Sequence, residues 1–347
     1  MNDVTITDVA DQSGVSLRTV SRVINGSSKV NADTRRKVEA VIESLGFRPS
    51  ARARALATGR SFLIGLIHDD PNALVLDPVQ RGLSEVCGAR GFEVVVHPCS
   101  YGSDSLLDNV RGFINRSRVD GVVVLPPLAE LKRLHQIIAE TNTPSVGIAS
   151  VPIVGADMLV SMERQAAQQL TRRLIALGHN KIAFISGPSR FVSAQQRREG
   201  FLDALTEAGL APAVMCEGDY SFESGLACGE AILDRTDRAT AVFASNDFMA
   251  AGVLKAMAAR GLTSPGDLSV AGFDDSSIAR MISPALTTIN RPMRAMAETA
   301  AYRLLARIDD GGANILGRDV QPQEIALQVV ERESTAQARE PGSASNF

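Results

Sequence analysis

The chain is 347 residues long, with 45% hydrophobic and 22% charged residues, which is ordinary for a globular protein and predicts two or three domains with a sizeable core. The sequence contains no apolar run near the ~20 residues of a transmembrane helix and no signal-like start, so we expect neither a membrane span nor secretion. The net charge of −3 argues against nucleic-acid binding, yet residues 1–60 hold ten Lys/Arg against six Asp/Glu. This basic end has the charge expected for phosphate contact, and the acidic remainder should lie away from a duplex.

Residues 4–25, VTITDVADQSGVSLRTVSRVIN, predict two short helices joined by a tight turn. Thr5 begins the first helix, with Asp8 in the capping-box position, and Ser16 begins the second. Gly14 suits the turn because glycine tolerates a left-handed backbone. Each helix carries one apolar stripe at helical spacing, formed by Ile6, Val9 and Ala10 in the first and by Val20, Val23 and Ile24 in the second.

The second of these helices leaves four residues together on its opposite face: Leu17, Arg18, Ser21 and Arg22. This is the layout of a helix-turn-helix, whose second helix enters the DNA major groove with its N-terminal residues at base edges. There an arginine can bind guanine bidentately, a serine can donate to phosphate or base, and a leucine can pack on a thymine methyl. The alternative for this stretch alone is a plain helical hairpin with a solvated arginine face.

A third helix closes this small core, and Asn31 begins it while Gly46 ends it in a C-cap position. Its apolar stripe consists of Val38, Val41, Ile42 and Leu45. Residues 48–60 follow as RPSARARALATGR, with four arginines, no acidic residue and Leu56 as the only large apolar side chain. A basic segment with one isolated leucine is unusual as core and reasonable as a DNA-facing hinge.

The motifs TxxDVAxxxGVSxxTVSRVIN, TRxKVxxxIxxLGFxP and ARALA resemble the LacI/GalR family of bacterial transcription regulators, and LGHxxIAFISGP, AVFASND, SVAGFDD and PALTTI extend the resemblance over residues 4–333. It implies a helix-turn-helix headpiece over residues 1–47 and a hinge over residues 48–60 that becomes helical only on DNA. Paired Leu56 side chains would then wedge into the minor groove. The DNA-binding residues that the resemblance implies are Thr5, Ser16, Leu17, Arg18, Thr19, Ser21, Arg22, Asn25, Asn31, Thr34, Ala53 and Leu56.

From residue 61 onward, compact apolar strands alternate with helices, which predicts a parallel α/β architecture. The first half has strands at 62–67, 92–97, 121–125 and 145–148 and helices at about 76–90, 106–116 and 131–140. The second half begins near Gln165 and has helices to 177 and at 193–208, 223–233 and 248–259, and strands in GHNKIAFISGP, at 240–244 and at 268–273. The segment PALTTINRPMRAMAETAAYRLLARI predicts a strand, a break at Pro292 and a long amphipathic helix, and a last strand follows at 325–331.

The resemblance implies that these halves form a two-subdomain effector core of the periplasmic-binding-protein type (type I) over residues 61–333. The first subdomain would comprise about 61–161 and 290–320, and the second about 162–289 and 321–333. The chain would cross between them three times. The composition of residues 334–347 predicts a disordered end.

Two such halves in tandem imply a cleft between them, where ligands bind at the carboxyl ends of the strands. The effector contacts that the resemblance implies are Asp69, Ser193, Arg197, Tyr220, Asn246 and Asp274. Their donors and acceptors suit vicinal hydroxyls, and an aromatic face covers the C–H side of a sugar ring, so we favour a saccharide. A nucleobase is the alternative, because the same residue types would serve a purine. Taken singly, Asp274 could cap a helix and Arg197 could be a surface charge.

One segment departs from the family pattern, because Val160-Ser161-Met162-Glu163 stands where the family usually has an Asp-Asn or Asp-Tyr pair. No contact is therefore carried over from it.

The sequence contains no GxSxG, P-loop or HExxH motif, which argues against an enzyme, and His179 suits a turn or cap better than catalysis. The four cysteines lack CxxC or Cys/His spacing, which predicts reduced structural thiols in a cytosolic protein without cofactor or metal.

Together these features predict a cytoplasmic homodimer that represses a carbohydrate-utilisation operon and leaves its palindromic operator when a saccharide binds. The absence of a leucine heptad after residue 333 favours a dimer over a tetramer. A corepressor-dependent regulator stays open, because linkage requires only that ligand and DNA affinities change by the same factor. A cytosolic sugar-binding protein and a sugar-modifying enzyme are the alternatives outside gene regulation.

Overall fold

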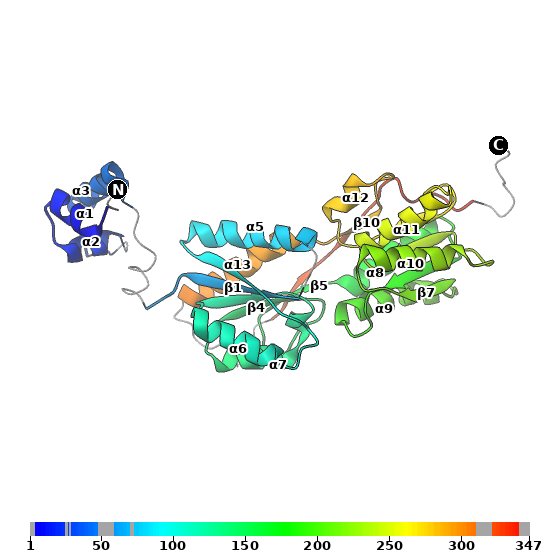
Figure 1. Ribbon diagram of the computed structural model, residues 1–347, viewed down its shortest axis with the longest axis horizontal. Coiled ribbons are helices and arrows are strands. Elements are labelled where there is room, and N and C mark those ends of the chain that lie inside the picture. Colours follow the sequence, from blue (N-terminus) through cyan, green and yellow to red (C-terminus); the bar gives the residue numbers. More distant parts are fainter. Residues whose placement is uncertain are drawn as a thin grey trace. The chain divides into compact units, whose positions relative to one another are not determined.

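The computed structural model describes residues 4–24, 27, 29–47, 59–69, 73–309 and 321–339. The chain divides into two compact units: Met1–Phe62 is a small helical unit and Leu63–Phe347 is an α/β unit (Figure 1). The predicted fold class, an all-α N-terminal domain followed by an α/β core, is confirmed. None of the described helices is both long and apolar enough to cross a lipid bilayer.

The helices of the small unit are α1 (Ile6–Ser13), α2 (Leu17–Ile24) and α3 (Ala32–Leu45). Their predicted ends are confirmed. The Thr5 hydroxyl accepts a hydrogen bond from the Asp8 amide, and the Asp8 carboxylate accepts one from the Thr5 amide, which completes the capping box. Gly14 and Gly46 end α1 and α3 with left-handed backbone, at φ +64° and +61°. The buried core consists of Val9, Ala10, Val20, Val23, Val38 and Phe47.

The α/β unit has two lobes, each built on a parallel sheet (Figure 1). In the first lobe the strand order is β11-β5-β4-β3-β1-β2. These strands are β1 (Leu63–His68), β2 (Glu93–Pro98), β3 (Gly121–Val124), β4 (Ser145–Ala149), β5 (Met158–Ser161) and β11 (Gln323–Ile325). Its helices are α5 (Ala73–Ala89), α6 (Leu106–Ser117), α7 (Lys132–Glu140), α13 (Met293–Asp309) and the short 3₁₀ helix η1 (Leu128–Glu130). Helices α5 and α13 pack together on one face of the sheet, and α6 and α7 cover the other.

The second lobe has a four-stranded sheet in the order β7-β6-β8-β9. Its strands are β6 (Ile182–Ser186), β7 (Val214–Glu217), β8 (Ala241–Ala244) and β9 (Ser269–Ala271). Its helices are α8 (Glu163–Ala176), α9 (Val192–Glu207), α10 (Phe222–Leu233), α11 (Asp247–Ala259) and α12 (Ser277–Met281). Strands β5 and β7 were not among the expected elements. Each has three apolar residues followed by a polar one, so neither gives the continuous apolar run by which the equally short β3 and β8 were predicted.

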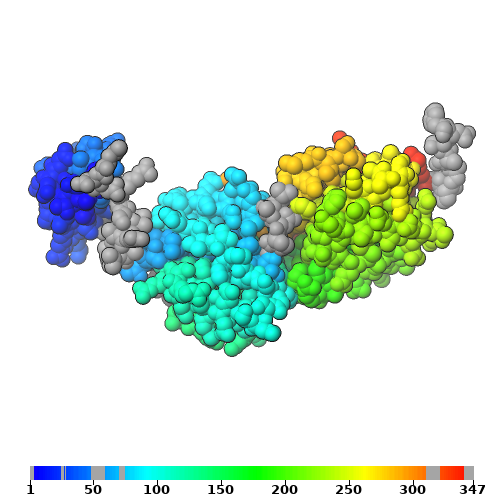
Figure 2. Space-filling model, viewed as in Figure 1, coloured from blue at the N-terminus to red at the C-terminus, as the bar shows by residue number. Residues whose placement is uncertain are grey.

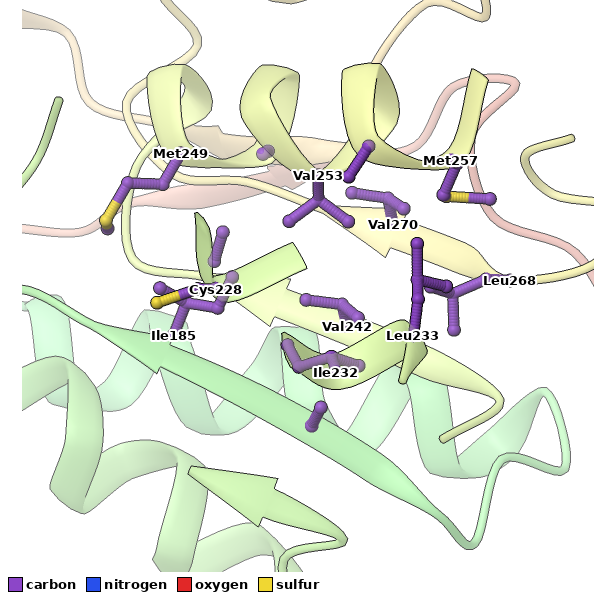
Figure 3. Close-up of a cluster of buried hydrophobic side chains, with 14 of the residues drawn as sticks. Ile185, Cys228, Ile232, Leu233, Val242, Met249, Val253, Met257, Leu268 and Val270 are labelled. Atoms are coloured by element: carbon purple, nitrogen blue, oxygen red, sulfur yellow. The ribbon is translucent and has the colours of Figure 1, made fainter. Parts of the chain in front are cut away.

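Helices α10 and α11 approach each other closely over this second sheet. A Cβ atom on Gly225 would lie 2.3 Å from the Met249 Cα, so a larger residue there would push the helices apart. Side chains from both helices interdigitate with those of the strands beneath them (Figure 3). The labelled core residues are Ile185, Cys228, Ile232, Leu233, Val242, Met249, Val253, Met257, Leu268 and Val270. This packing holds the N-terminal end of α11 in place at the edge of the second sheet.

The chain passes between the lobes at three crossovers: Met162, Arg291-Pro292 and Ala326-Leu327. Figure 2 shows the two lobes as separate masses, the first mainly blue to cyan and the second mainly green to gold. The predicted last strand at 325–331 is in fact two strands, β11 and β12 (Gln328–Val330). Strand β11 pairs with β5 in the first lobe, whereas β12 pairs antiparallel with β10 (Thr288–Asn290). Residues 323–325 therefore lie in the first lobe's sheet, contrary to the predicted boundary at 321.

The prediction of a disordered end from residue 334 is wrong for residues 334–339. Ser334 is fully buried and donates to the Val270 carbonyl at 2.6 Å. The His179 Nε2 lies 3.0 Å from the Ala336 carbonyl, and the Ala338 amide donates to the Leu177 carbonyl at 2.8 Å. The segment is held by hydrogen bonds rather than by large apolar side chains, so its composition did not reveal its order. Residues 340–347 lie outside the described part of the chain.

Candidate functional site

Helix α2 presents its predicted face at the surface of the small unit. Leu17 is 48% exposed, Arg18 is exposed, and Ser21 and Arg22 are partly buried. The first turn of α2 holds no acidic residue, and its last turn holds Arg22. This face therefore offers two guanidinium groups and one apolar side chain at the surface of a single helix, a combination that can contact phosphates and base edges.

The other candidate DNA contacts described in this unit lie at helix N-termini. Ser16 accepts a hydrogen bond from the Thr19 amide at 3.2 Å, and their hydroxyls lie 2.9 Å apart. The Asn31 side chain accepts from the Thr34 amide at 2.8 Å, and Thr5 caps α1 as already described. Helix N-termini readily bind phosphate, so a capping role is compatible with a DNA contact. The remaining candidates, Asn25, Ala53 and Leu56, lie outside the described residues.

A cavity of about 870 Å³ is lined by both lobes of the α/β unit, at the carboxyl ends of their strands. All six predicted effector residues line it: Asp69, Ser193, Arg197, Tyr220, Asn246 and Asp274. They come from five separate places in the chain, after β1, in α9, before α10, after β8 and after β9. The structure thus brings together residues that are up to two hundred positions apart in the sequence.

Aromatic side chains form one wall of this cavity. The rings of Tyr220 and Phe191 are parallel to within 9°, with centroids 6.3 Å apart. Tyr101, from the first lobe, meets Phe191 edge-on at 5.0 Å. Burial raises the pKa of the Tyr220 phenol, so it stays protonated near neutral pH. Phe191 lies just before α9 and was not predicted, since an apolar residue at a helix start looks like ordinary core.

Asn246 fixes the backbone next to this wall. Its side-chain oxygen accepts from the Met249 amide at 2.9 Å and so caps α11, while its Nδ2 donates to the Tyr220 carbonyl at 2.9 Å. Tyr220 has a positive φ of 71°, an unfavourable value for a side chain of this size. The hydrogen bond from Asn246 helps to hold this conformation, so Asn246 positions Tyr220 as well as lining the cavity.

At the floor of the cavity lies a largely buried cluster of two arginines and two carboxylates, of which Arg197, Asp274 and Arg291 line the cavity and Glu163 lies behind them. Arg197 is only 3% exposed, and its Nε donates to a Glu163 carboxylate oxygen at 2.7 Å. Its Nη1 donates to the Ser245 carbonyl at 2.5 Å, and its Nη2 lies 3.5 Å from Asp274 Oδ1. Arg291 completes the cluster, with its Nη2 3.3 Å from the other Glu163 oxygen. The four charges balance to zero.

These contacts exclude the alternative roles considered for Arg197 and Asp274. Arg197 is not a surface charge, because its guanidinium is buried and lies 3.8 Å from the centroid of the Phe273 ring. Asp274 is not a helix cap, because Ser276 occupies the N-cap of the next helix, α12. Asp274 also has a positive φ of 105°, a strained value that a functional site can retain.

Glu163, which pairs with both arginines of this cluster, was not among the predicted site residues. Burial alone raises the pKa of Glu163, but the charges of Arg197 and Arg291 outweigh burial and lower it, so the carboxylate is ionised. It belongs to the segment from which no contact was carried over, because that segment departs from the family pattern. Its place at an expected crossover between the two halves was the available signal, since such a segment borders the cleft.

A second acidic group lies behind the floor. Asp247, the first residue of α11, accepts from the Ser276 amide at 2.7 Å and from the Thr288 hydroxyl at 2.6 Å. Burial and the neighbouring Asp274 charge raise the pKa of Asp247 to about 7. Burial likewise raises the pKa of Asp69 in the cavity lining. Among the described residues, no three His, Cys, Asp or Glu side chains are grouped to hold a metal ion.

Comparison with known proteins agrees with this geometry. Residues 5–50 match the model of bacterial regulatory proteins of the lacI family, and residues 171–335 match a periplasmic binding protein-like domain. Catabolite control protein A of Priestia megaterium is 33% identical over 312 residues, which cover 88% of this chain and 92% of that protein. The regulator CelR of Thermobifida fusca is 33% identical, covering 93% and 95%. The repressor PurR of Haemophilus influenzae (strain PittEE) is 32% identical, covering 94% and 98%.

Solved structures give the same result at the level of the fold. The lac repressor dimer bound to operator and the anti-inducer ONPF matches with a TM-score of 0.79 and 29% identity, covering 96% of this chain and all of that one. The CelR–cellobiose complex matches with a TM-score of 0.69 and 30% identity, covering 95% and 99%. On this evidence the chain belongs to the LacI family of bacterial transcriptional regulators, with a helix-turn-helix headpiece and a periplasmic-binding-protein-like core.

Proposed function

We propose that this protein is a repressor that binds a pseudo-palindromic operator as a homodimer and leaves it when a neutral saccharide fills the cavity between the lobes. The exposed face of α2, with Leu17 and Arg18, supports the DNA-binding half of the proposal. The operator-bound dimer of the similar lac repressor supports two headpieces acting together. Such a protein acts in the cytoplasm, where the chromosome lies.

The charge balance of the cavity floor carries the proposal of a neutral ligand. Both guanidinium groups, Arg197 and Arg291, already face carboxylates of Glu163 and Asp274. A phosphate or carboxylate would have to compete with these buried partners, whereas a hydroxyl can donate to a carboxylate or accept from a guanidinium without displacing a charge. The Tyr220 ring offers the apolar surface that a sugar ring needs. The similar CelR was solved with cellobiose, a neutral disaccharide.

A purine is the second candidate, and the parallel rings of Phe191 and Tyr220 favour it. A flat base can stack on such a wall, and Asp274 with Arg197 can pair with its polar edge. The relative PurR of Haemophilus influenzae is 32% identical to this chain. If a purine binds, the sign of the response can also reverse, so that the ligand promotes rather than weakens operator binding.

A thermal-shift panel separates these candidates. The panel contains cellobiose, ribose and adenine, with glucose 6-phosphate as a charged counterpart. We expect a neutral sugar to raise the melting temperature and glucose 6-phosphate to have no effect. A shift with adenine alone would indicate that the ligand is a purine and not a saccharide. A shift with glucose 6-phosphate alone would contradict the proposal that the cavity binds a neutral ligand.

Gel-shift assays with DNA upstream of the protein's own gene test the regulatory half. We expect a specific complex that the compound identified by the panel dissociates, and Asp274→Asn should abolish that response while operator binding is retained. Asp237→Asn, at an exposed ion pair of the same lobe, is the matched control and should respond normally. Without any specific complex, with or without the panel compounds, the protein would be a sugar-binding protein rather than a repressor. Release of a modified sugar would instead indicate an enzyme.

The proposed hinge has its own test. Leu56→Ala should weaken specific operator binding and spare the thermal shift, because an apolar wedge acts only on bent DNA. Unchanged operator affinity in this variant would remove the minor-groove wedge from the proposal and leave the headpiece alone to bind the operator.

A further inference from the structure

Two of the three crossovers between the lobes carry a buried charge. Glu163 is the first residue of α8, directly after the crossover at Met162, and Arg291 lies in the crossover between β10 and α13. Glu163 is 1% exposed and Arg291 is 8% exposed. Their side chains meet across the junction, with Arg291 Nη2 3.3 Å from Glu163 Oε1. One ion pair therefore joins two connections that are 128 positions apart in the chain.

Glu163 is also bound from three directions. Its Oε1 accepts from the Ser161 hydroxyl, at the end of the first lobe's β5, at 3.0 Å. Its Oε2 accepts from Arg197, on the cavity floor in the second lobe, at 2.7 Å. A single carboxylate thus contacts the first lobe, the second lobe and a crossover. A change in the relative orientation of the lobes must alter at least one of these contacts.

The third crossover is hydrogen-bonded to the first crossover, next to Glu163. The Met162 amide donates to the Ile325 carbonyl at 3.1 Å, which joins the first connection to the end of β11. The Arg291 amide approaches the Asp274 carbonyl at 3.4 Å, and the Met293 amide donates to the Arg291 carbonyl at 2.7 Å. Among the described residues, the Nε and Nη2 atoms of Arg291 are buried and have no hydrogen-bond partner of good geometry. Its position therefore depends chiefly on the charge of Glu163 and on the weaker contact with Asp274 at 3.9 Å.

We propose that the buried Glu163–Arg291 pair is the joint that couples occupancy of the cavity to the relative orientation of the two lobes. Glu163 is a positioning residue in this scheme, because it lies behind the cavity lining, whereas Arg291 lines the cavity together with Arg197 and Asp274. A ligand that bonds to Arg197 or Asp274 shifts the charges against which Glu163 and Arg291 are held. The crossovers then move with them. The ligand-response test of this inference rests on the proposed function, whereas its hydrogen-exchange test rests on the structure alone.

The decisive variant is the double substitution Glu163→Gln/Arg291→Gln. It removes both charges but keeps the side-chain length at position 163, so Arg197 retains an acceptor and Asp274 retains its guanidinium partner. Single substitutions are less informative, because each leaves an unbalanced buried charge and can unfold the protein. The matched control is Arg172→Gln/Glu207→Gln, which removes an exposed ion pair between α8 and α9 in the second lobe.

The first readout needs no ligand. Hydrogen exchange of the full-length protein measures the opening of the Met162 and Met293 amides at the crossovers. We expect at least tenfold faster exchange at both amides in the double variant at positions 163 and 291, with unchanged exchange in the control. Equal exchange in the double variant and the unaltered protein would overturn the proposal, since the pair would then hold nothing in place.

The second readout compares ligand binding with the DNA response, using cellobiose, ribose and adenine as probes. With both proteins saturated by the active probe, we expect the double variant to show at least tenfold less change in operator affinity than the unaltered protein. A full operator response would overturn the coupling role. So would complete loss of probe binding in the folded variant, since the pair would then act by binding the ligand rather than by joining the lobes. If the unaltered protein responds to no probe, the proposed function fails, and the exchange measurement still decides the joint.

Discussion

The two candidate functional surfaces of this protein, the face of α2 and the cavity of the α/β unit, are built in opposite ways. The α2 face comes from one continuous helix whose charged residues lie at the surface. The cavity draws its residues from many separate segments, and the charges on its floor are buried and paired. A solvated charge can be altered with little effect on folding, whereas a buried pair contributes to both folding and binding. We therefore expect substitutions on the exposed face of α2 to change recognition alone.

Arg197→Ala should have the largest effect and is the strongest test of this contrast. It leaves the carboxylates of Glu163 and Asp274 buried beside Arg291 alone, and breaking such a pair costs about 3–5 kcal/mol of unfolding free energy. Urea unfolding followed by circular dichroism measures the loss. Arg172→Ala, at the exposed pair with Glu207, should cost less than about 1 kcal/mol. Equal losses in the two variants would contradict the distinction between buried and exposed charges.

Arg22→Ala tests the other side of the comparison. We expect the free energy of unfolding to change by no more than about 0.5 kcal/mol, as at most surface positions. Discrimination between the operator and a base-substituted operator should fall by about 1–3 kcal/mol if Arg22 bonds to a base. Fluorescence anisotropy at constant salt measures both affinities. A uniform loss of affinity for every sequence would instead identify Arg22 as a phosphate contact.

Asp247→Asn should flatten the dependence of stability on pH. The folded-state pKa of about 7 lies above the ordinary value of 3.8, so the unfolded state releases this proton first and stability falls as pH rises from about 4 to 7. Between pH 5.5 and 8 the ionisation of this one group should lower the free energy of unfolding by about 2 kcal/mol, and the asparagine variant should not show this decrease. Urea midpoints at the two pH values measure the difference. An identical pH dependence in both proteins would show that Asp247 is ionised throughout.

Thr5→Ala should give the smallest effect. The capping box at the start of α1 is exposed, and loss of an N-cap typically costs about 1 kcal/mol. Hydrogen exchange at the Asp8 and Val9 amides of the full-length protein should accelerate about fivefold. Gln12→Ala, at an exposed position of the same helix, is the control. A loss larger than that of Arg197→Ala would reverse the expected order of the two regions.

The helical unit could be predicted almost completely because its determinants are local. Caps at Thr5 and Asn31, the turn at Gly14 and the apolar stripes depend on residues three or four positions apart. Phe47 is the exception in its core, since it follows the C-cap of α3 and belongs to no helical stripe. In the α/β unit the alternation of strands and helices was predictable as well. The short strands β5 and β7 were not, and the apolar run at 325–331 gave no sign of the break at Leu327.

By itself the sequence determined the family, the fold class, the helical caps and the six candidate effector residues, because each is carried by a local pattern or a short motif. Only the tertiary structure decided that Glu163 and Arg291 meet, that Asn246 holds Tyr220, and that residues 334–339 pack onto the second lobe. The physical reason is that a buried charge must be neutralised by whatever group the fold brings near it. That partner can lie more than a hundred residues away, where no local pattern reaches.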